Sequence, residues 1–284
     1  MTTIPPDEST YVFDAEQSEE VARLTLQDRF LTKEMGGPLV GIPDPSTLHD
    51  VLDVACGPGG WASDVAYELS KCSVTGIDNS ESLLEYARMR AKAQGLENAT
   101  FCTMNILQPL EFPDNSFDLV NARMLFAVLH REAWPAFIAE CVRVLRPGGY
   151  LRLTEPSDVG QLVTPAAARM QMISLDAFWR IGYGFSPDGS SLGLTPVLPR
   201  LVRAAHIHNV HLYAHALETS PEIDSWSNHS RNYQVVIQQI KVLAVKMGLI
   251  SQEEMDDLYQ QILYEMNSDD FCSIWHFVTI VGQK

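Results

Sequence analysis

The alternation of short apolar runs with helical patterns between residues 50 and 155 most constrains what this 284-residue chain can fold into. Parallel strands need crossover connections, which helices supply, and such connections are right-handed. The alternation therefore predicts a parallel sheet with helices on both of its faces. The strands are expected over residues 49–55, 73–77, 99–104, 117–122 and 150–154, and the helices over 61–69, 80–93 and 134–145.

The turn at residues 57–60, Gly-Pro-Gly-Gly, joins the first expected strand to the first expected helix. Glycines let a backbone turn tightly and approach a ligand closely, and a helix N-terminus presents free N–H groups to an anion. By spacing, Gly57, Gly59 and Ala62 fit the dinucleotide fingerprint, and Asp78 ends the next strand about 20 residues later, where a carboxylate can grip ribose hydroxyls. These residues leave two cofactor classes open, nicotinamide dinucleotides and S-adenosylmethionine.

Asp53 favours one of these two classes. It lies in an otherwise apolar strand, four residues before Gly57, and a buried carboxylate needs a partner. Beside a pyrophosphate it would repel, whereas a sulfonium cofactor with an α-ammonium group offers it positive charge. In the alternative interpretation, Asp53 braces the glycine loop by accepting its N–H bonds, and both interpretations can hold together.

Four segments in this order resemble the motifs of class I S-adenosylmethionine-dependent methyltransferases. They are VLDVACGPGG at residues 51–60, GIDNS at 76–80, FPDNSFDLV at 112–120 and VLRPGG at 144–149. The subgroup that the chain resembles is that of the small-molecule enzymes similar to ubiquinone/menaquinone-biosynthesis methyltransferases. The resemblance covers residues 50–155. The flanking segments contain no matching motif and are assigned only from their position relative to this region.

The resemblance implies S-adenosyl-L-methionine as the cofactor and gives roles to the matched positions. By this resemblance, the backbone of Gly57 and Gly59 lies against the methionine portion. Asp78 holds the ribose hydroxyls with Asn79 beside it, and the apolar side chain of Leu83 packs on adenine. Asn105 stands where the family commonly has an Asp that accepts the adenine amino group, so here the acceptor is a neutral amide. The expected cofactor-binding residues are Tyr11, Asp53, Ala55, Gly57, Gly59, Asp78, Asn79, Leu83, Asn105, Ile106 and Asn121.

The less regular flanks predict a lid and a cap. Helices are expected over 14–35, 166–181, 197–205, 237–247 and 252–266, and strands over 210–216 and 271–281. We predict an α/β, doubly wound, Rossmann-like fold with a seven-stranded, mostly parallel sheet and a helical cap. The expected parts are an N-terminal helical lid (1–49), the cofactor-binding core (50–156), a cap insertion (157–195), more core (196–217), a helical cap insertion (218–267) and a final core strand (268–284).

Methyl transfer is an in-line displacement, so alignment and exclusion of water can supply much of the catalysis. A base is needed only if the acceptor must lose a proton early. The candidate catalytic residues are Glu155 and His130, with Arg123 at the end of the fourth strand, where it and Asn121 face the transferred methyl group. In the alternative interpretations, His130 is a solvated residue at a helix start and Glu155 belongs to a structural ion pair, with Arg123 as the partner considered.

Charge and composition favour a small-molecule acceptor. The formal net charge is −16, with no Lys/Arg cluster, which argues against nucleic acid because phosphate neutralisation supplies most of that affinity. No apolar run approaches the roughly 20 residues of a membrane span. A polar start and five scattered cysteines indicate a cytoplasmic protein with reduced thiols, expected as a monomer or homodimer. The four histidines at 206, 208, 211 and 215 are not expected to bind a metal.

Two other functions stay open on sequence grounds. A nicotinamide-dependent oxidoreductase is disfavoured by Asp53, by Pro58 and by the lack of a suitably placed Tyr-x-x-x-Lys pair. A non-catalytic S-adenosylmethionine-binding protein would keep the motifs but lack an acceptor pocket. Aromatic residues of the flanks either wall such a pocket or form the core of the cap: Tyr11, Phe13, Trp179, Tyr183, Phe185, Tyr233 and Trp275.

Overall fold

The structure is a computed structural model that describes residues 18–223, 226–268 and 270–284. The described chain divides into two compact units, one of residues 18–155, 198–213 and 279–284, the other of residues 156–197 and 214–278. Tyr11 and Phe13 lie outside the described residues. Within the described residues, no helix is long and apolar enough to cross a membrane.

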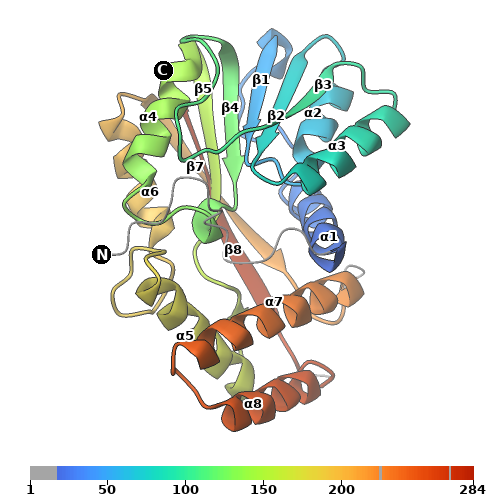
Figure 1. The fold of residues 1–284 in the computed structure, drawn as a ribbon, viewed down its shortest axis with the longest axis vertical. Coiled ribbons are helices and arrows are strands. Elements are labelled where there is room, and N and C mark those ends of the chain that lie inside the picture. Colours follow the sequence, from blue (N-terminus) through green and yellow to red (C-terminus); the bar gives the residue numbers. More distant parts are fainter. Residues whose placement is uncertain (1–17, 224–225, 269) are drawn as a thin grey trace. The chain divides into compact units, whose positions relative to one another are not determined.

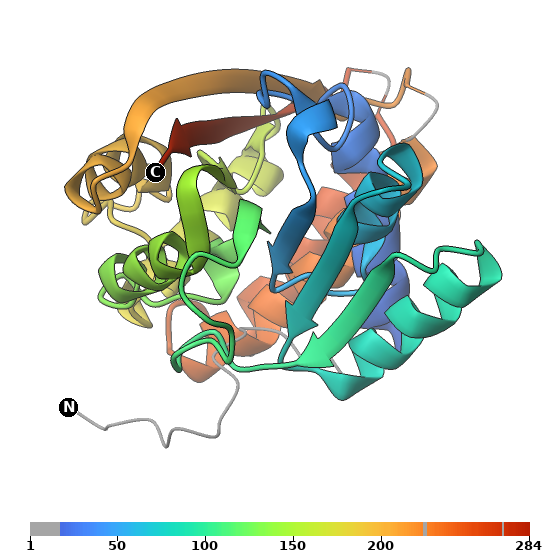
Figure 2. The ribbon, with the colours of Figure 1, turned by 90° about the horizontal axis from the view of Figure 1, so that it is seen from above.

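The first unit is built on a sheet with the strand order β3-β2-β1-β4-β5-β8. Its parallel strands are β1 (Asp50–Val54), β2 (Ser73–Asp78), β3 (Ala99–Thr103), β4 (Phe117–Arg123) and β5 (Leu145–Pro156). Helices α2 (Gly60–Glu68) and α3 (Glu81–Ala93) cover one face, and α4 (Trp134–Val144) and α6 (Leu194–Ala204) lie on the other (Figure 2). The expected doubly wound α/β fold is confirmed.

Two further strands, β7 (His208–Glu218) and β8 (Ser273–Gln283), pair with each other and pass from one unit into the other. In the described part of the chain the sheet has eight strands, one more than expected, because β6 (Gln161–Leu162) pairs antiparallel with β8. Strands are predicted from alternating apolar and polar residues over about four or more positions, so a strand of two residues cannot be predicted in this way. The four histidines lie in and just before β7, and within the described residues no group of His, Cys, Asp or Glu is arranged to hold a metal ion.

The order of the strands reverses at β1, which lies between β2 and β4. Ligands of open α/β sheets bind outside the carboxyl ends of the strands at such a switch point. Helix α1 (Ser18–Glu34) lies beyond these ends, next to α2 (Figure 1). Beneath them the core is apolar, with Val51, Leu119 and Trp61 at most 1% exposed.

Residues 147–149, which belong to the VLRPGG segment, form a bulge inside β5. Residues Leu145 and Tyr150 pair with Phe117 and Leu119 of β4, so the residues between them loop out of the register. The last residue of the chain fills the gap, since Gly148 N donates to Lys284 O at 2.8 Å and Lys284 N donates to Gly149 O at 2.9 Å.

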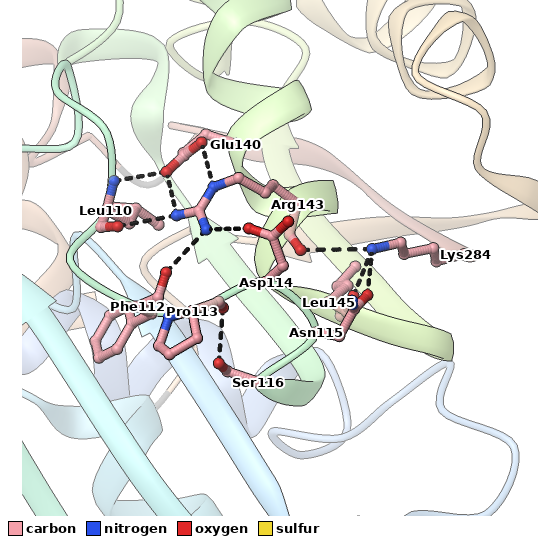
Figure 3. A network of polar contacts seen from close by, with 10 residues as sticks. All are labelled: Leu110, Phe112, Pro113, Asp114, Asn115, Ser116, Glu140, Arg143, Leu145 and Lys284. Atoms are coloured by element: carbon pink, nitrogen blue, oxygen red, sulfur yellow. Dashed lines mark hydrogen bonds and ion pairs between the residues drawn. The ribbon is translucent and has the colours of Figure 1, made fainter.

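A network of polar contacts holds the segment that leads into β4 (Figure 3). From α4, the Arg143 guanidinium donates to the carbonyls of Leu110 and Phe112 at 2.9 and 2.8 Å and pairs with Asp114 at 2.7 Å. Lys284 Nζ donates to Asn115 Oδ1 at 2.9 Å and to the carbonyl of Leu145 at 2.6 Å. The segment 112–120 is therefore fixed to α4 and to the chain's last residue.

The second unit is mainly helical, with α5 (Pro165–Arg180) packed on α7 (Trp226–Lys246) and α8 (Gln252–Glu265). Helix α7 begins eleven residues before the expected 237, because its first turns are polar and show no apolar period. The Glu265 carboxylate accepts the N–H groups of Ala166 and Ala167 at 3.1 and 3.2 Å, which satisfies the N-terminus of α5. The rings of Trp275 and Phe277 are in contact, with centroids 4.6 Å apart and planes tilted by 59°.

Candidate functional site

The glycine loop follows β1 and begins α2. Gly57 and Gly59 have φ angles of +54° and +69°, a region that favours glycine, and Ala55 also has a positive φ of +54°. Asp78, at the end of β2, holds the loop, since its Oδ2 accepts the Gly57 N–H at 2.9 Å and its Oδ1 accepts the Ser80 N–H at 3.0 Å. Burial raises the pKa of Asp78, and these N–H bonds lower it again.

The three glycines of the loop have different surroundings. Among the residues that the structure describes, a Cβ at Gly57 would meet no atom within 4 Å, so this backbone borders open space there. A Cβ at Gly59 would lie 2.6 Å from the Phe101 ring and 2.7 Å from Ala87 Cβ, and one at Gly60 would overlap the Asp28 carboxylate. Gly59 and Gly60 are therefore required for packing, and Gly57 leaves room for a ligand.

Asp53 lies in β1 and is 3% exposed. Its Oδ1 accepts a hydrogen bond from Asn121 Nδ2 at 2.7 Å, and Asn121 Oδ1 accepts one from Arg152 Nη1, also at 2.7 Å. The expected alternative role of Asp53 as the brace of the glycine loop is wrong for Gly57, whose N–H is accepted by Asp78 instead. Burial raises the pKa of Asp53 to about 7, against the lowering effect of Arg123 and of the Asn121 hydrogen bond.

Asn121 was expected to face the transferred methyl group. Its residue is 0% exposed, and both ends of its amide are used by Asp53 and Arg152. A side chain that no solvent reaches cannot line a ligand site, so that expectation is corrected for the side chain of Asn121. Arg152, which no motif contains, is the residue that sequence reasoning missed here.

Arg123 ends β4 and is bonded to α1. Its guanidinium donates to Thr32 Oγ1 at 3.0 Å and forms an ion pair with Asp28. The other oxygen of that carboxylate, Asp28 Oδ2, is buried without a hydrogen-bond partner in the part of the chain that the structure describes. Sequence reasoning missed Asp28 as well, because nothing local distinguishes it from the other charges of α1.

Glu155 lies one residue before the end of β5 and is 1% exposed. Its carboxylate accepts the N–H groups of Leu125 and Phe126 at 2.7 and 3.0 Å, at the start of the short helix η2 (Leu125–Ala127). The ion pair considered with Arg123 is wrong, since Arg123 pairs with Asp28. Burial raises the pKa of Glu155 to about 8. Glu155 therefore braces the backbone after β4, and its role as a base stays a prediction.

The remaining expected residues lie along the carboxyl ends of β2, β3 and β4. Leu83, in the first turn of α3, and Ile106, after β3, are buried. The side chain of Asn105 accepts the Leu107 N–H at 2.9 Å. His130 is half-buried before α4, where its carbonyl accepts the Ala133 N–H at 2.9 Å. The other expected residue of this edge, Asn79, is exposed.

The donors and acceptors at this edge fit S-adenosylmethionine. A ligand can lie against the open backbone of Gly57, beside the carboxylate of Asp78. Asp53 and the unpartnered Asp28 Oδ2 are anionic acceptors, which suit an ammonium or sulfonium and would repel a pyrophosphate. The residues present therefore fit a cationic cofactor better than a dinucleotide.

Comparison with known proteins agrees with this chemistry. Residues 51–149 match the family described as "Methyltransferase domain". This range contains all four motifs. The match confirms the resemblance inferred from the four motifs.

Two curated relatives are similar to part of the chain. The chain is 37% identical over 109 residues to a demethylmenaquinone methyltransferase of Listeria welshimeri, an alignment that covers 38% of this chain and 45% of the relative. It is 36% identical over 105 residues to a sterol 24-C-methyltransferase of Gibberella zeae, covering 37% of this chain and 27% of the relative. The chain thus spans less than half the length of these relatives.

The fold extends beyond the matched domain. A solved structure of an S-adenosylmethionine-dependent methyltransferase of Thermotoga maritima is similar over 93% of this chain and 95% of that chain, with a TM-score of 0.51 at 18% identity. At this identity the likeness concerns the fold alone. The elements around the methyltransferase domain therefore also occur together in a known fold.

Proposed function

We propose that the protein is an S-adenosylmethionine-dependent methyltransferase that transfers a methyl group to an O, N or C atom of a small-molecule acceptor. The arrangement that carries the proposal is the glycine loop, in which Asp78 holds the Gly57 N–H at 2.9 Å while Gly57 itself borders open space. The methyltransferase-domain match over residues 51–149 supports the same assignment.

The proposed cofactor contacts follow the order of the strands. Asp78 and Asn79, after β2, bind the ribose hydroxyls, and Asp53 receives the α-ammonium group. Asp28 approaches the same group from α1, because its free carboxylate oxygen lacks a donor within the described residues. Tyr11 is proposed to belong to the lid, and the remaining proposed contacts are Ala55, Gly57, Gly59, Leu83, Asn105 and Ile106.

The bound cofactor would supply an electrophilic methyl group with a neutral leaving group. The chain's own contribution is to align the acceptor and to exclude water. Arg123 holds α1 at the end of β4 through Asp28, which fixes one wall beside the glycine loop. Of the two candidate bases, His130 is the more accessible, since it is half-buried and Glu155 is 1% exposed.

The acceptor is proposed to be an apolar small molecule such as a quinone or a secondary metabolite. The names of the two curated relatives, a demethylmenaquinone and a sterol methyltransferase, support this class. The net charge of −16 disfavours nucleic acid as the substrate.

Binding of S-adenosylhomocysteine, 5′-methylthioadenosine and NADH, measured by calorimetry on the whole chain, tests the cofactor. We expect both adenosyl thioethers to bind and NADH not to bind. Binding of NADH alone would instead support the nicotinamide-dependent oxidoreductase and refute the proposal. Methyl transfer from radiolabelled S-adenosylmethionine to a panel of quinols, phenols and amines tests catalysis, and cofactor binding without transfer to any member would favour the non-catalytic alternative.

A further inference from the structure

A buried row of polar residues crosses three neighbouring strands of the first unit. Asp53 of β1 is paired in register with Asn121 of β4, and Asn121 is paired with Arg152 of β5. Their side chains are joined by two hydrogen bonds of 2.7 Å. The three residues are 3%, 0% and 1% exposed, so no water competes for these bonds. We call Asp53, Asn121 and Arg152 the polar row.

The chemistry of arginine fixes the direction of the polar row. A guanidinium only donates hydrogen bonds, so the atom of Asn121 that faces Arg152 must be the amide oxygen. The amide NH₂ then faces Asp53 and donates to Oδ1. A carboxylate is a better acceptor for this donor than a carboxylic acid. Arg152 therefore favours the ionised form of Asp53 through the Asn121 amide that lies between them.

Arg152 has no carboxylate in direct contact among the described residues. Its Nε donates to the Val40 carbonyl at 3.3 Å, and its guanidinium lies 5.9 Å from the centre of the Trp61 ring. Burial lowers the pKa of Arg152 to about 9. A buried cation is costly unless it is compensated, and an ordinary core residue would fill this place without that cost. The position of Arg152 is therefore explained by what it does to Asp53.

Other charged groups around Asp53 shift its pKa in opposite directions. Arg123, at the end of β4, lowers its pKa, and Asp28, on α1, raises it, while burial raises it most. With the pKa of Asp53 at about 7, its charge at neutral pH depends on small contributions. Loss of the amide donor would shift the balance toward the protonated acid.

We propose that Arg152 and Asn121 are positioning residues that keep Asp53 ionised and oriented to receive the α-ammonium group of the cofactor. This proposal rests on the proposed function. Without Arg152 the Asn121 amide is free to rotate, and its oxygen would then face Asp53 and favour the acid. The cofactor would lose the anion that recognises its ammonium group and keep the contacts to its adenosine portion.

Two ligands distinguish binding of the ammonium group from binding of the adenosine portion. S-adenosylhomocysteine carries the ammonium group, and 5′-methylthioadenosine has the same adenosine and thioether without it. We expect the wild-type affinity for S-adenosylhomocysteine to fall by about tenfold per pH unit below about pH 7, and the affinity for 5′-methylthioadenosine to stay level. Calorimetry between about pH 5.5 and 8.5 measures both.

Arg152→Met retains the volume of the side chain and removes the donor. We expect the pH midpoint for S-adenosylhomocysteine to rise by about one unit, which weakens binding at pH 7 by about tenfold, with 5′-methylthioadenosine unaffected. Arg152→Lys, which still donates, should restore part of the affinity. Thr154→Val is the matched control, because Thr154 is equally buried in β5 and bonds Thr279 at 2.9 Å, outside the polar row. It should leave the pH profile unchanged.

Asn121→Ser breaks the polar row at its middle residue and serves as the second test if Arg152→Met does not fold. The inference is overturned if both variants keep the wild-type pH profile, or if they weaken the two ligands equally. If the wild-type protein binds neither ligand, the proposed function fails instead. The two failures are therefore distinguishable.

Discussion

Gly60 and Asp28 offer a direct test of how α1 is held beside the glycine loop. A methyl group at residue 60 would overlap the Asp28 carboxylate. Gly60 is helical, with no positive φ, so alanine brings no backbone strain there. Any loss of stability in Gly60→Ala must come from displacing Asp28 from Arg123.

The magnitude follows from the ion pair that is lost. The side chains of Arg123 and Asp28 are 11% and 14% exposed, so water screens them little. A hydrogen bond to a charged group contributes about 1.5–3 kcal/mol to the free energy of unfolding. Replacing glycine by alanine inside a helix raises that free energy by at most about 1 kcal/mol. We expect Gly60→Ala to cost about 1–2 kcal/mol and Asp28→Ala about 2 kcal/mol.

The double variant distinguishes this explanation from general damage. Both single changes lose the same ion pair, so the double variant should cost no more than about 2 kcal/mol rather than the sum of the two. Urea unfolding of the four proteins measures these free energies. Asp114→Ala, which removes the remote ion pair with Arg143 at 2.7 Å, is the control and should add to Gly60→Ala. Additive costs for Gly60→Ala and Asp28→Ala would refute the reasoning.

Three further outcomes are expected. Asp78→Asn replaces the carboxylate that holds the Gly57 N–H and should weaken both S-adenosylhomocysteine and 5′-methylthioadenosine by about tenfold or more in calorimetry; unchanged affinity for both would remove Asp78 from the site. The pKa of Glu155 is raised from 4.5 to about 8, so the folded protein binds its proton more tightly than the unfolded chain, and stability is lost as the pH rises from about 5 to 8. Glu155→Gln should make this fall in the urea midpoint smaller, and an equal fall in both proteins would contradict the assignment. Lys284→Met removes the 2.6 Å bond to the Leu145 carbonyl and should lower stability by about 1–2 kcal/mol, seen as a Tm lower by a few degrees; an unchanged Tm would show that the Lys284 side chain does not stabilise the start of β5.

Local sequence was enough to predict the elements that build the site. Strand β1, the glycine loop and Asp78 at the end of β2 lie where the alternation and the turn residues indicated, because these signals come from neighbouring residues. The same holds for the helix expected over residues 80–93, since α3 begins at Glu81, where the Ser80 hydroxyl accepts the Leu83 N–H at 3.3 Å. The late start predicted for α7 was wrong, because the polar first turns of that helix carry no apolar period.

The partners of the buried charges were decided only by the tertiary structure. Asp53 was recognised as an unusual carboxylate, but its bond to Asn121 spans 68 residues of the chain. Arg152 and Asp28 belong to no motif, and their roles arise from the register of β5 and the position of α1. Local patterns were enough to predict the strand, loop and helix of the site, and Asp53 with the four motifs predicted the cofactor. Which charges meet inside that frame depended on strand order and register, since long-range pairing leaves no local pattern.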